Sequence, residues 1–219
     1  MKPRLLAMGD SALLVKFGEE IDPVINQRVH QLDALLRTDR MAGVIETVPA
    51  YATLLLHYDP LILPYAQVSK WVNIELAKVR PDIHRKPRRI EVPVRYGGEH
   101  GLDLDFIASL HHISKEEIIS LHTGREYTVY MMGFTPGFAY MGKLDDRLAT
   151  SRLETPRIRV AAGSVGIAGS QTGIYPIDSP GGWRLIGRTS LPLFDLASDM
   201  PFLFSPGDIV QFVNEGLDA

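Results

Sequence analysis

The chain contains no cysteine among its 219 residues. This absence excludes disulfide bonds, thiolate metal ligands and a cysteine nucleophile, and it is typical of the cytoplasm, where we expect the protein to reside. The sequence also lacks a strong charge of one sign, since its formal net charge is −3. No apolar run approaches the roughly 20 residues that span a bilayer. We therefore expect neither a nucleic acid nor a membrane as a partner.

Several common catalytic signatures are absent as well. The sequence has no GxxxxGK[ST] phosphate-binding loop, no GxSxG nucleophile elbow and no HExxH zinc helix. It has no His or Asp cluster with the spacing of metal ligands, so we expect no metal site. If ATP is used, its phosphates are held in another way or partly by another chain.

Two glycine-rich runs stand out in the second half of the chain. The first is GFTPGFAYMG, Gly133 to Gly142, and the second is AGSVGIAGSQTGIYPIDSPGGWRLIGRT, Ala162 to Thr189. Glycine at this density lets a backbone turn sharply or approach another group closely. Polar and aromatic side chains lie between these turns, and together the two runs predict a ligand pocket on a barrel. A barrel with many tight turns and no pocket is the alternative that glycine alone favours.

Residues 1–80 have the pattern of a small α/β domain. Asp22 followed by Pro23 is typical of a helix start, with the aspartate as N-cap and the proline at the first helical position. Apolar residues follow at helical spacing from Ile25 to Leu36. The other expected elements are two short apolar segments joined by a turn (Arg4 to Met8 and Ala12 to Phe17), two strands (Val44 to Val48 and Thr53 to Tyr58) and a second helix (Gln67 to Val79).

The pattern changes after residue 80. The segment Arg80 to Arg89, RPDIHRKPRR, is basic and nearly free of apolar residues. We interpret residues 81–89 as an interdomain linker, and a basic patch for an anionic partner is the alternative.

Residues 90–219 have the pattern of a β-barrel domain. Ile90 to Val94 alternates like an edge strand, where Pro93 is tolerated. Two short helices are expected next, and Ser114 begins the second with a capping box that ends at Glu117. Short strands with Gly or Pro punctuation then run to the end and predict a closed or nearly closed barrel. The expected helices are Leu104 to His111 and Ser114 to Leu121, and the last expected strand is Ile209 to Val213.

Five polar side chains are candidates for the pocket. Arg188 can hold a carboxylate bidentately, and Arg157 has the same chemistry, but surface ion pairs are the alternative for both. Gln171 and Thr172 can hydrogen-bond an amide-like ligand or simply cap a turn. Ser164 lies in Gly163-Ser164-Val165-Gly166, which can present backbone N–H groups to an anion or serve as a turn between strands.

One histidine and four aromatic residues complete the candidate site. His122 can move protons near neutral pH, or it can complement the dipole at the end of a helix. Phe134 and Phe138 flank a turn and can wall a pocket, as can Tyr175 and Trp183. Core packing or contact with a partner protein is the alternative for the aromatic residues.

Long stretches of the sequence resemble one known family. These stretches are MGDSALLVKFG near the start, YGGEHGLDLD (Tyr96 to Asp105), LHTGREYTVYMMGFTPGFAYMG (Leu121 to Gly142), AGSVGIAGSQTGIYP (Ala162 to Pro176) and SPGGWRLIGRT (Ser179 to Thr189). They are similar to the family known as the 5-oxoprolinase B subunit, kinase A inhibitor, or allophanate hydrolase subunit 1. The resemblance covers the whole chain.

The resemblance implies an α+β fold, with a small N-terminal α/β domain followed by a C-terminal cyclophilin-like β-barrel. It implies the C and A subunits as partners in an ATP-dependent 5-oxoprolinase, which opens 5-oxo-L-proline to L-glutamate. ATP, with Mg, would act at the level of the complex without binding tightly to this chain, and the chain alone would be inactive. In that setting His122 and Arg188 are the expected catalytic residues. The expected substrate-binding residues are Phe134, Phe138, Arg157, Ser164, Gln171, Thr172, Tyr175 and Trp183.

The family names also suggest another function. As a kinase inhibitor, the chain would bind the dimerisation and phosphotransfer helices of a sporulation histidine kinase. Prolyl isomerase activity is a third hypothesis, and it depends on analogy of fold alone.

Overall fold

The computed structural model describes residues 2–80 and 87–218. The chain divides into two compact units, Met1–Lys86 and Pro87–Ala219. Most of the segment interpreted as a linker, residues 81–86, lies outside the described residues. Its last residues belong to the second unit, because Arg88 Nε donates to Asp208 Oδ1 at 3.0 Å and Arg89 begins a strand.

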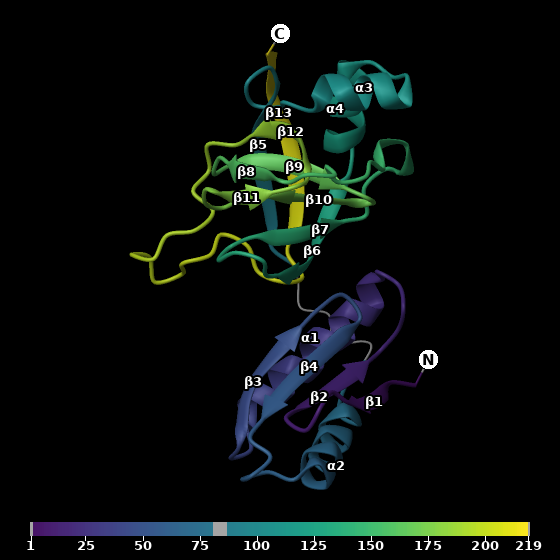
Figure 1. The fold of residues 1–219 in the computed structure, drawn as a ribbon, viewed down its shortest axis with the longest axis vertical. Helices are drawn as coiled ribbons and strands as arrows, with labels where there is room; N and C mark the ends of the chain where they lie inside the picture. The colour runs from purple at the N-terminus through teal and green to yellow at the C-terminus, as the bar shows by residue number, and fades with distance from the viewer. Residues whose placement is uncertain (1, 81–86, 219) are drawn as a thin grey trace. The chain divides into compact units, whose positions relative to one another are not determined.

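The first unit is a four-stranded antiparallel sheet with two helices (Figure 1). The strand order is β1-β2-β4-β3. One apolar cluster joins strand residues such as Leu54 to Val29 and Leu32 of α1 and to Val72 of α2. The elements are β1 (Arg4–Ala7), β2 (Ala12–Lys16), α1 (Pro23–Thr38), β3 (Val44–Pro49), β4 (Thr53–Tyr58) and α2 (Tyr65–Leu76).

The starts of the two helices follow from local sequence. Asp22 Oδ1 accepts a hydrogen bond from the Ile25 N–H at 2.9 Å, with Pro23 in the first turn, so the predicted N-cap is confirmed. The second helix begins earlier than the apolar pattern indicated, directly after Pro64. The ring of Pro64 restricts the backbone just before the helix, where proline's missing N–H is not needed for a helical hydrogen bond.

The second unit is a closed barrel with the strand order β10-β7-β6-β13-β5-β12-β9 (Figure 1). A separate two-stranded sheet pairs β8 with β11. The α+β class and the barrel agree with the sequence prediction. The elements are β5 (Arg89–Gly97), α3 (Leu104–His111), α4 (Lys115–Thr123), β6 (Glu126–Met132), β7 (Ala139–Gly142), the 3-10 helix η1 (Asp146–Leu148), β8 (Arg157–Val160), β9 (Ser164–Ala168), β10 (Gln171–Ile174), β11 (Ser179–Gly181), β12 (Arg184–Arg188) and β13 (Ile209–Asp218).

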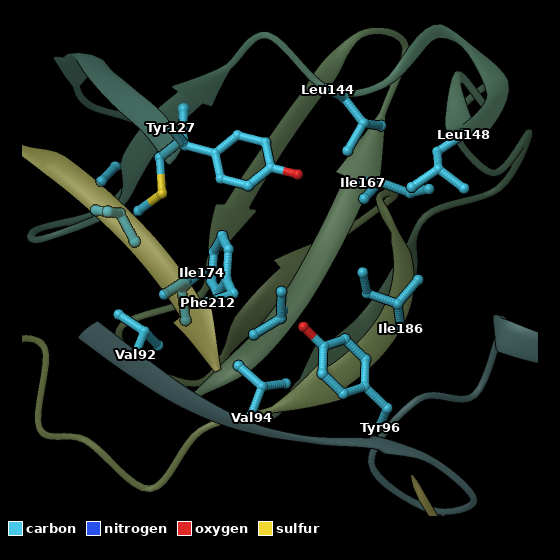
Figure 2. Packing of buried hydrophobic residues seen from close by; sticks show 14 of the residues in the cluster. Val92, Val94, Tyr96, Tyr127, Leu144, Leu148, Ile167, Ile174, Ile186 and Phe212 are labelled. Atoms are coloured by element: carbon cyan, nitrogen blue, oxygen red, sulfur yellow. The ribbon is translucent and has the colours of Figure 1, made fainter. Parts of the chain in front are cut away.

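The barrel interior is filled by side chains from almost every strand. Figure 2 shows Val94 and Tyr96 of β5 facing Ile167 of β9 and Phe212 of β13, and all four are buried. Alternate strand residues supply this core because successive side chains point to opposite faces. The barrel is therefore a packed core, and ligand sites lie outside it.

The edge character predicted for Ile90 to Val94 is confirmed for that part of β5 alone. β5 lies between β13 and β12 in the closed barrel. β13 runs parallel to it over its whole length, whereas β12 pairs with it only at Arg95 and Tyr96. Pro93 thus lies where the strand has a neighbour on one side only, which is the condition that a proline needs.

Candidate functional site

The glycine-rich runs build tight approaches between the barrel strands. Gly163 has φ +82, and a Cβ at this position would lie 2.1 Å from the carbonyl oxygen of Thr189. Gly181 approaches Tyr175 so closely that a Cβ would lie 2.4 Å from its hydroxyl oxygen. These positions require glycine for close packing.

The backbone near Gly163 is not open to an anion. Its N–H donates to the Tyr175 carbonyl at 2.7 Å, and the Ser164 N–H donates to the Ala161 carbonyl at 3.2 Å. Val165 and the residues after it belong to β9. The structure therefore has a turn at residues 162–163, and Ser164 is buried as the first residue of β9.

His122 lies in the barrel interior, fully buried. Its Nδ1 is 2.8 Å from the Tyr96 hydroxyl and its Nε2 is 2.9 Å from the Thr172 hydroxyl. Because the Thr172 hydroxyl donates to the Gly166 carbonyl at 3.2 Å, it accepts from Nε2–H, and Nδ1 then accepts from Tyr96. The Tyr127 hydroxyl donates to the His122 carbonyl at 2.9 Å. Figure 2 shows both tyrosine hydroxyls inside the barrel.

Burial keeps this interior chain of hydrogen bonds neutral. It lowers the pKa of His122 to about 3 and raises the pKa values of Tyr96 and Tyr127 well above the usual 10. Neither His122 nor Thr172 lines a pocket described below. The arrangement therefore does not support proton transfer by His122 to a ligand.

Four of the predicted aromatic residues gather in one pocket of about 300 Å³. The Phe138 ring is at its centre, with ring-centroid distances of 5.3 Å to Tyr175 and 5.4 Å to Trp183. Phe134 lies at the mouth, 61% exposed, with a positive φ of 68 that is uncommon outside glycine. The pocket is lined by Phe134, Phe138, Tyr140, Arg152, Leu153, Pro156, Tyr175, Pro180, Gly181, Gly182 and Trp183.

Arg152 brings a positive charge to this aromatic pocket. Its Cζ is 5.8 Å from the Trp183 ring centroid, a cation–π arrangement. Burial raises the pKa values of Tyr140 and Tyr175, and the charge of Arg152 opposes both shifts. Arg152 makes no ion pair with another described residue. No sequence pattern pointed to Arg152, because it lies between the two glycine-rich runs.

Arg188 lines a different pocket, of about 550 Å³, together with Arg95 and His100. Its Nε donates to the Ala162 carbonyl at 2.9 Å. Tyr175 lines the aromatic pocket, and the next residue along the chain, Pro176, lines the pocket that contains Arg188.

The remaining predicted residues lie outside both pockets. Arg157 binds the buried Asp103 at 3.0 Å, and Arg184 binds the same carboxylate at 3.4 Å. Asp103 also accepts from the Leu185 N–H at 2.7 Å, so this cluster fastens the start of α3 to β12. Gln171 lies in β10, where it pairs with Ala168 of β9.

No group of three or more His, Cys, Asp or Glu side chains able to hold a metal is found in the described part of the chain. Among these same residues, no helix has the length and apolar character needed to cross a membrane.

Comparison with known families identifies the chain. Residues 3–204 match the family described as carboxyltransferase domain, subdomain C and D. The chain belongs to this family. It is 44% identical over 216 residues to a protein of Bacillus subtilis named as the B subunit of 5-oxoprolinase, covering 94% of this chain and 90% of that protein. A protein of the same name from Escherichia coli O157:H7 is 38% identical, covering 97% and 96%.

A solved structure supports the fold of this family member. The crystal structure of TTHA0988 matches with a TM-score of 0.81 and 37% identity, over 93% of this chain. The match spans only 39% of that longer chain.

Proposed function

We propose that this chain is the B subunit of an ATP-dependent 5-oxoprolinase, which opens 5-oxo-L-proline to L-glutamate together with the A and C subunits. The observation that carries the proposal is the match, over at least nine tenths of both lengths, to two relatives that bear this name. The chain is expected to be inactive alone, because a B subunit implies other subunits.

The aromatic pocket is the proposed substrate site. 5-Oxoproline is a small, nearly flat lactam ring with one carboxylate. The rings of Phe138, Tyr175 and Trp183 offer flat apolar faces of matching size, and the pocket volume of about 300 Å³ accommodates the molecule. Arg152 is placed to hold the carboxylate by charge-assisted hydrogen bonds. In this proposal Arg152 takes the role that the sequence suggested for Arg188.

The reaction explains why ATP is required. An unstrained lactam is a poor electrophile, and transfer of a phosphoryl group to its oxygen creates a leaving group. Water then adds to the ring carbon, the C–N bond breaks with the nitrogen taking up a proton, and a second water hydrolyses the resulting acyl phosphate to the glutamate carboxylate and inorganic phosphate. In this scheme the B and C subunits carry out the activation, the A subunit completes ring opening, and ATP with Mg acts at the level of the complex. The contribution of this chain is to bind and orient the lactam.

The test measures glutamate release from 5-oxoproline and ATP by the chain mixed with its candidate A and C subunits, with each component omitted in turn. Activity is expected only with all three. Arg152→Ala in the complete mixture should raise KM by about tenfold or more, since it removes a charge-assisted contact to the carboxylate. The matched control is Arg147→Ala, an exposed arginine that pairs with Asp145 outside the pocket.

Lack of activity in a mixture whose B–C complex forms would overturn the proposal. The histidine-kinase inhibitor would then be the leading hypothesis. It predicts kinase binding that Arg152→Ala leaves unchanged if the docking surface lies elsewhere on the barrel.

A further inference from the structure

Two arginines face each other across neighbouring strands of the barrel. Arg188 of β12 is the direct register partner of Arg95 of β5. Directly opposed residues in an antiparallel pair point to the same face of the sheet. Both side chains are exposed, and both line the pocket of about 550 Å³.

Among the described residues, no acid forms an ion pair with Arg95 or Arg188. The only hydrogen bond found there for either side chain is the one that Arg188 Nε donates to the Ala162 carbonyl. Glu215 also lines the pocket without pairing to them. Asp178, whose pKa is lowered in small part by the charge of Arg188, is held instead by Arg159 at 2.6 Å. Like charges directly opposite each other on a sheet repel, and an anion bound between them would remove that repulsion.

A second pair of arginines on the same barrel serves to stabilise the fold and provides a contrast. Arg157 and Arg184 converge on Asp103, whose side chain is buried and accepts from both. That cluster carries its own counter-charge. Arg95 and Arg188, by contrast, form no ion pair with an acid among the described residues.

Other groups at the pocket suit an oxyanion. His100 lines it, and its Nδ1 is buried without a hydrogen-bond partner among the described residues, while its Nε2 is 3.3 Å from Asp218 Oδ2. Ser190 adds an exposed hydroxyl to the lining. Two planar guanidiniums on one face match the several oxygens and multiple charge of a phosphate group better than a single carboxylate.

We propose that the Arg95–Arg188 pocket binds the phosphate group of a ligand that carries two or more negative charges. Inorganic pyrophosphate and the phosphate chain of a nucleotide share this chemistry. Consecutive residues, Tyr175 and Pro176, line the aromatic pocket and this pocket respectively. The proposal goes beyond the lactam site and does not depend on it, because binding is measured without 5-oxoproline.

The experiment is calorimetric titration of the full chain with inorganic pyrophosphate, ATP, adenosine and acetate. Pyrophosphate and ATP should bind, and adenosine and acetate should not. Arg95→Ala and Arg188→Ala should each weaken pyrophosphate binding by about tenfold or more, as expected for loss of a charge-assisted contact. The matched control is Arg89→Ala, an exposed arginine on the same strand that pairs with Glu126 and lines neither pocket. It should leave binding unchanged.

The outcomes separate clearly. Equal affinity for pyrophosphate and ATP would show that the phosphates alone are recognised, and tighter ATP binding would add a contribution from the nucleoside. An equal loss in Arg89→Ala would reveal a general electrostatic attraction and overturn the proposal. The proposal also fails if pyrophosphate at about 1 mM does not bind, or if Arg95→Ala retains full affinity. Thermal unfolding of each variant, with and without pyrophosphate, checks that the variant is folded.

Discussion

Buried polar groups and pocket-lining charges in this barrel are paired to very different degrees. Asp103 receives two guanidiniums and a backbone N–H, and His122 is hydrogen-bonded at both ring nitrogens. By contrast, Arg152 in the aromatic pocket and the Arg95–Arg188 pair form no ion pair within the described residues. All of these groups lie in one domain, yet only the first set is internally satisfied.

The difference separates groups that hold the fold from groups that we propose to bind a ligand. A buried polar group without a partner costs folding free energy, so the interior must be matched. An exposed guanidinium is solvated and costs little, so it can stay unpaired until an anion arrives. Removing a paired group should therefore damage stability, and removing an unpaired one should damage binding.

The largest effect is expected for Asp103→Ala. The substitution leaves Arg157 and Arg184 without their counter-charge and the Leu185 N–H without its acceptor. We expect the free energy of unfolding to fall by about 3–5 kcal/mol, measured by urea denaturation. Asp105→Ala on the same helix is the control, because Asp105 is exposed and its pair with Lys115 lies at the surface. It should cost less than about 1 kcal/mol, and similar losses in both variants would contradict the comparison.

The second effect concerns pH and His122. Burial lowers its pKa from 6.5 to about 3, so the unfolded chain takes up a proton at pH values where the folded chain does not. The stability from this neutral histidine is complete above pH 6.5 and is lost as the pH falls toward 3, by about 1.4 kcal/mol per pH unit. Urea denaturation from pH 7 to pH 4 should show a flatter pH dependence in His122→Gln, which cannot titrate. If the free energy of unfolding of His122→Gln depends on pH as steeply as that of the unmodified chain, the barrel interior does not exclude the protonated His122 ring.

A smaller loss is expected for Gly163→Ala, which disturbs the backbone beside Arg188 without removing a charge. The new Cβ meets the Thr189 carbonyl in addition to the strain of φ +82. We expect a loss of about 2–3 kcal/mol, from the strain of the left-handed conformation and from displacement of β12. Gly207→Ala is the control, with φ +85 and nothing within 4 Å of the added Cβ. It should cost about 1–2 kcal/mol, and thermal unfolding of both variants isolates the clash.

The smallest effect on stability is expected for Arg95→Ala. Because its guanidinium has no ion-pair partner among the described residues and opposes Arg188, the free energy of unfolding should change by no more than about 0.5 kcal/mol. Urea denaturation measures the change. A loss as large as that of Asp103→Ala would place Arg95 among the groups that hold the fold.

Local features of the sequence predicted local features of the fold. The Asp22–Pro23 helix start and the Ser114 cap, whose Oγ accepts from the Glu117 N–H at 3.1 Å, depend on neighbours a few residues away. The position of β5 inside the closed barrel did not follow, since it depends on β13 far along the chain.

The candidate site was only partly predictable, for the same reason. The aromatic residues of the glycine-rich runs do meet in one pocket, because they flank β7, β10 and β12, and barrel pairing brings these strands together through β9. His122 was placed correctly at the end of a helix, but its burial depends on Tyr96 and Thr172 from distant strands. Arg95 gains its significance only from its register with Arg188, which no local pattern reveals.

The place of β13 in the barrel has a consequence for synthesis on the ribosome. This strand, Ile209–Asp218, lies between β5 and β6 and completes the ring of strands. Until it leaves the exit tunnel, the earlier strands can form only an open sheet, whose two free edges are β5 and β6. Barrel closure therefore follows translation of β13, and the nascent domain is exposed to edge-to-edge aggregation or to chaperone capture until that moment.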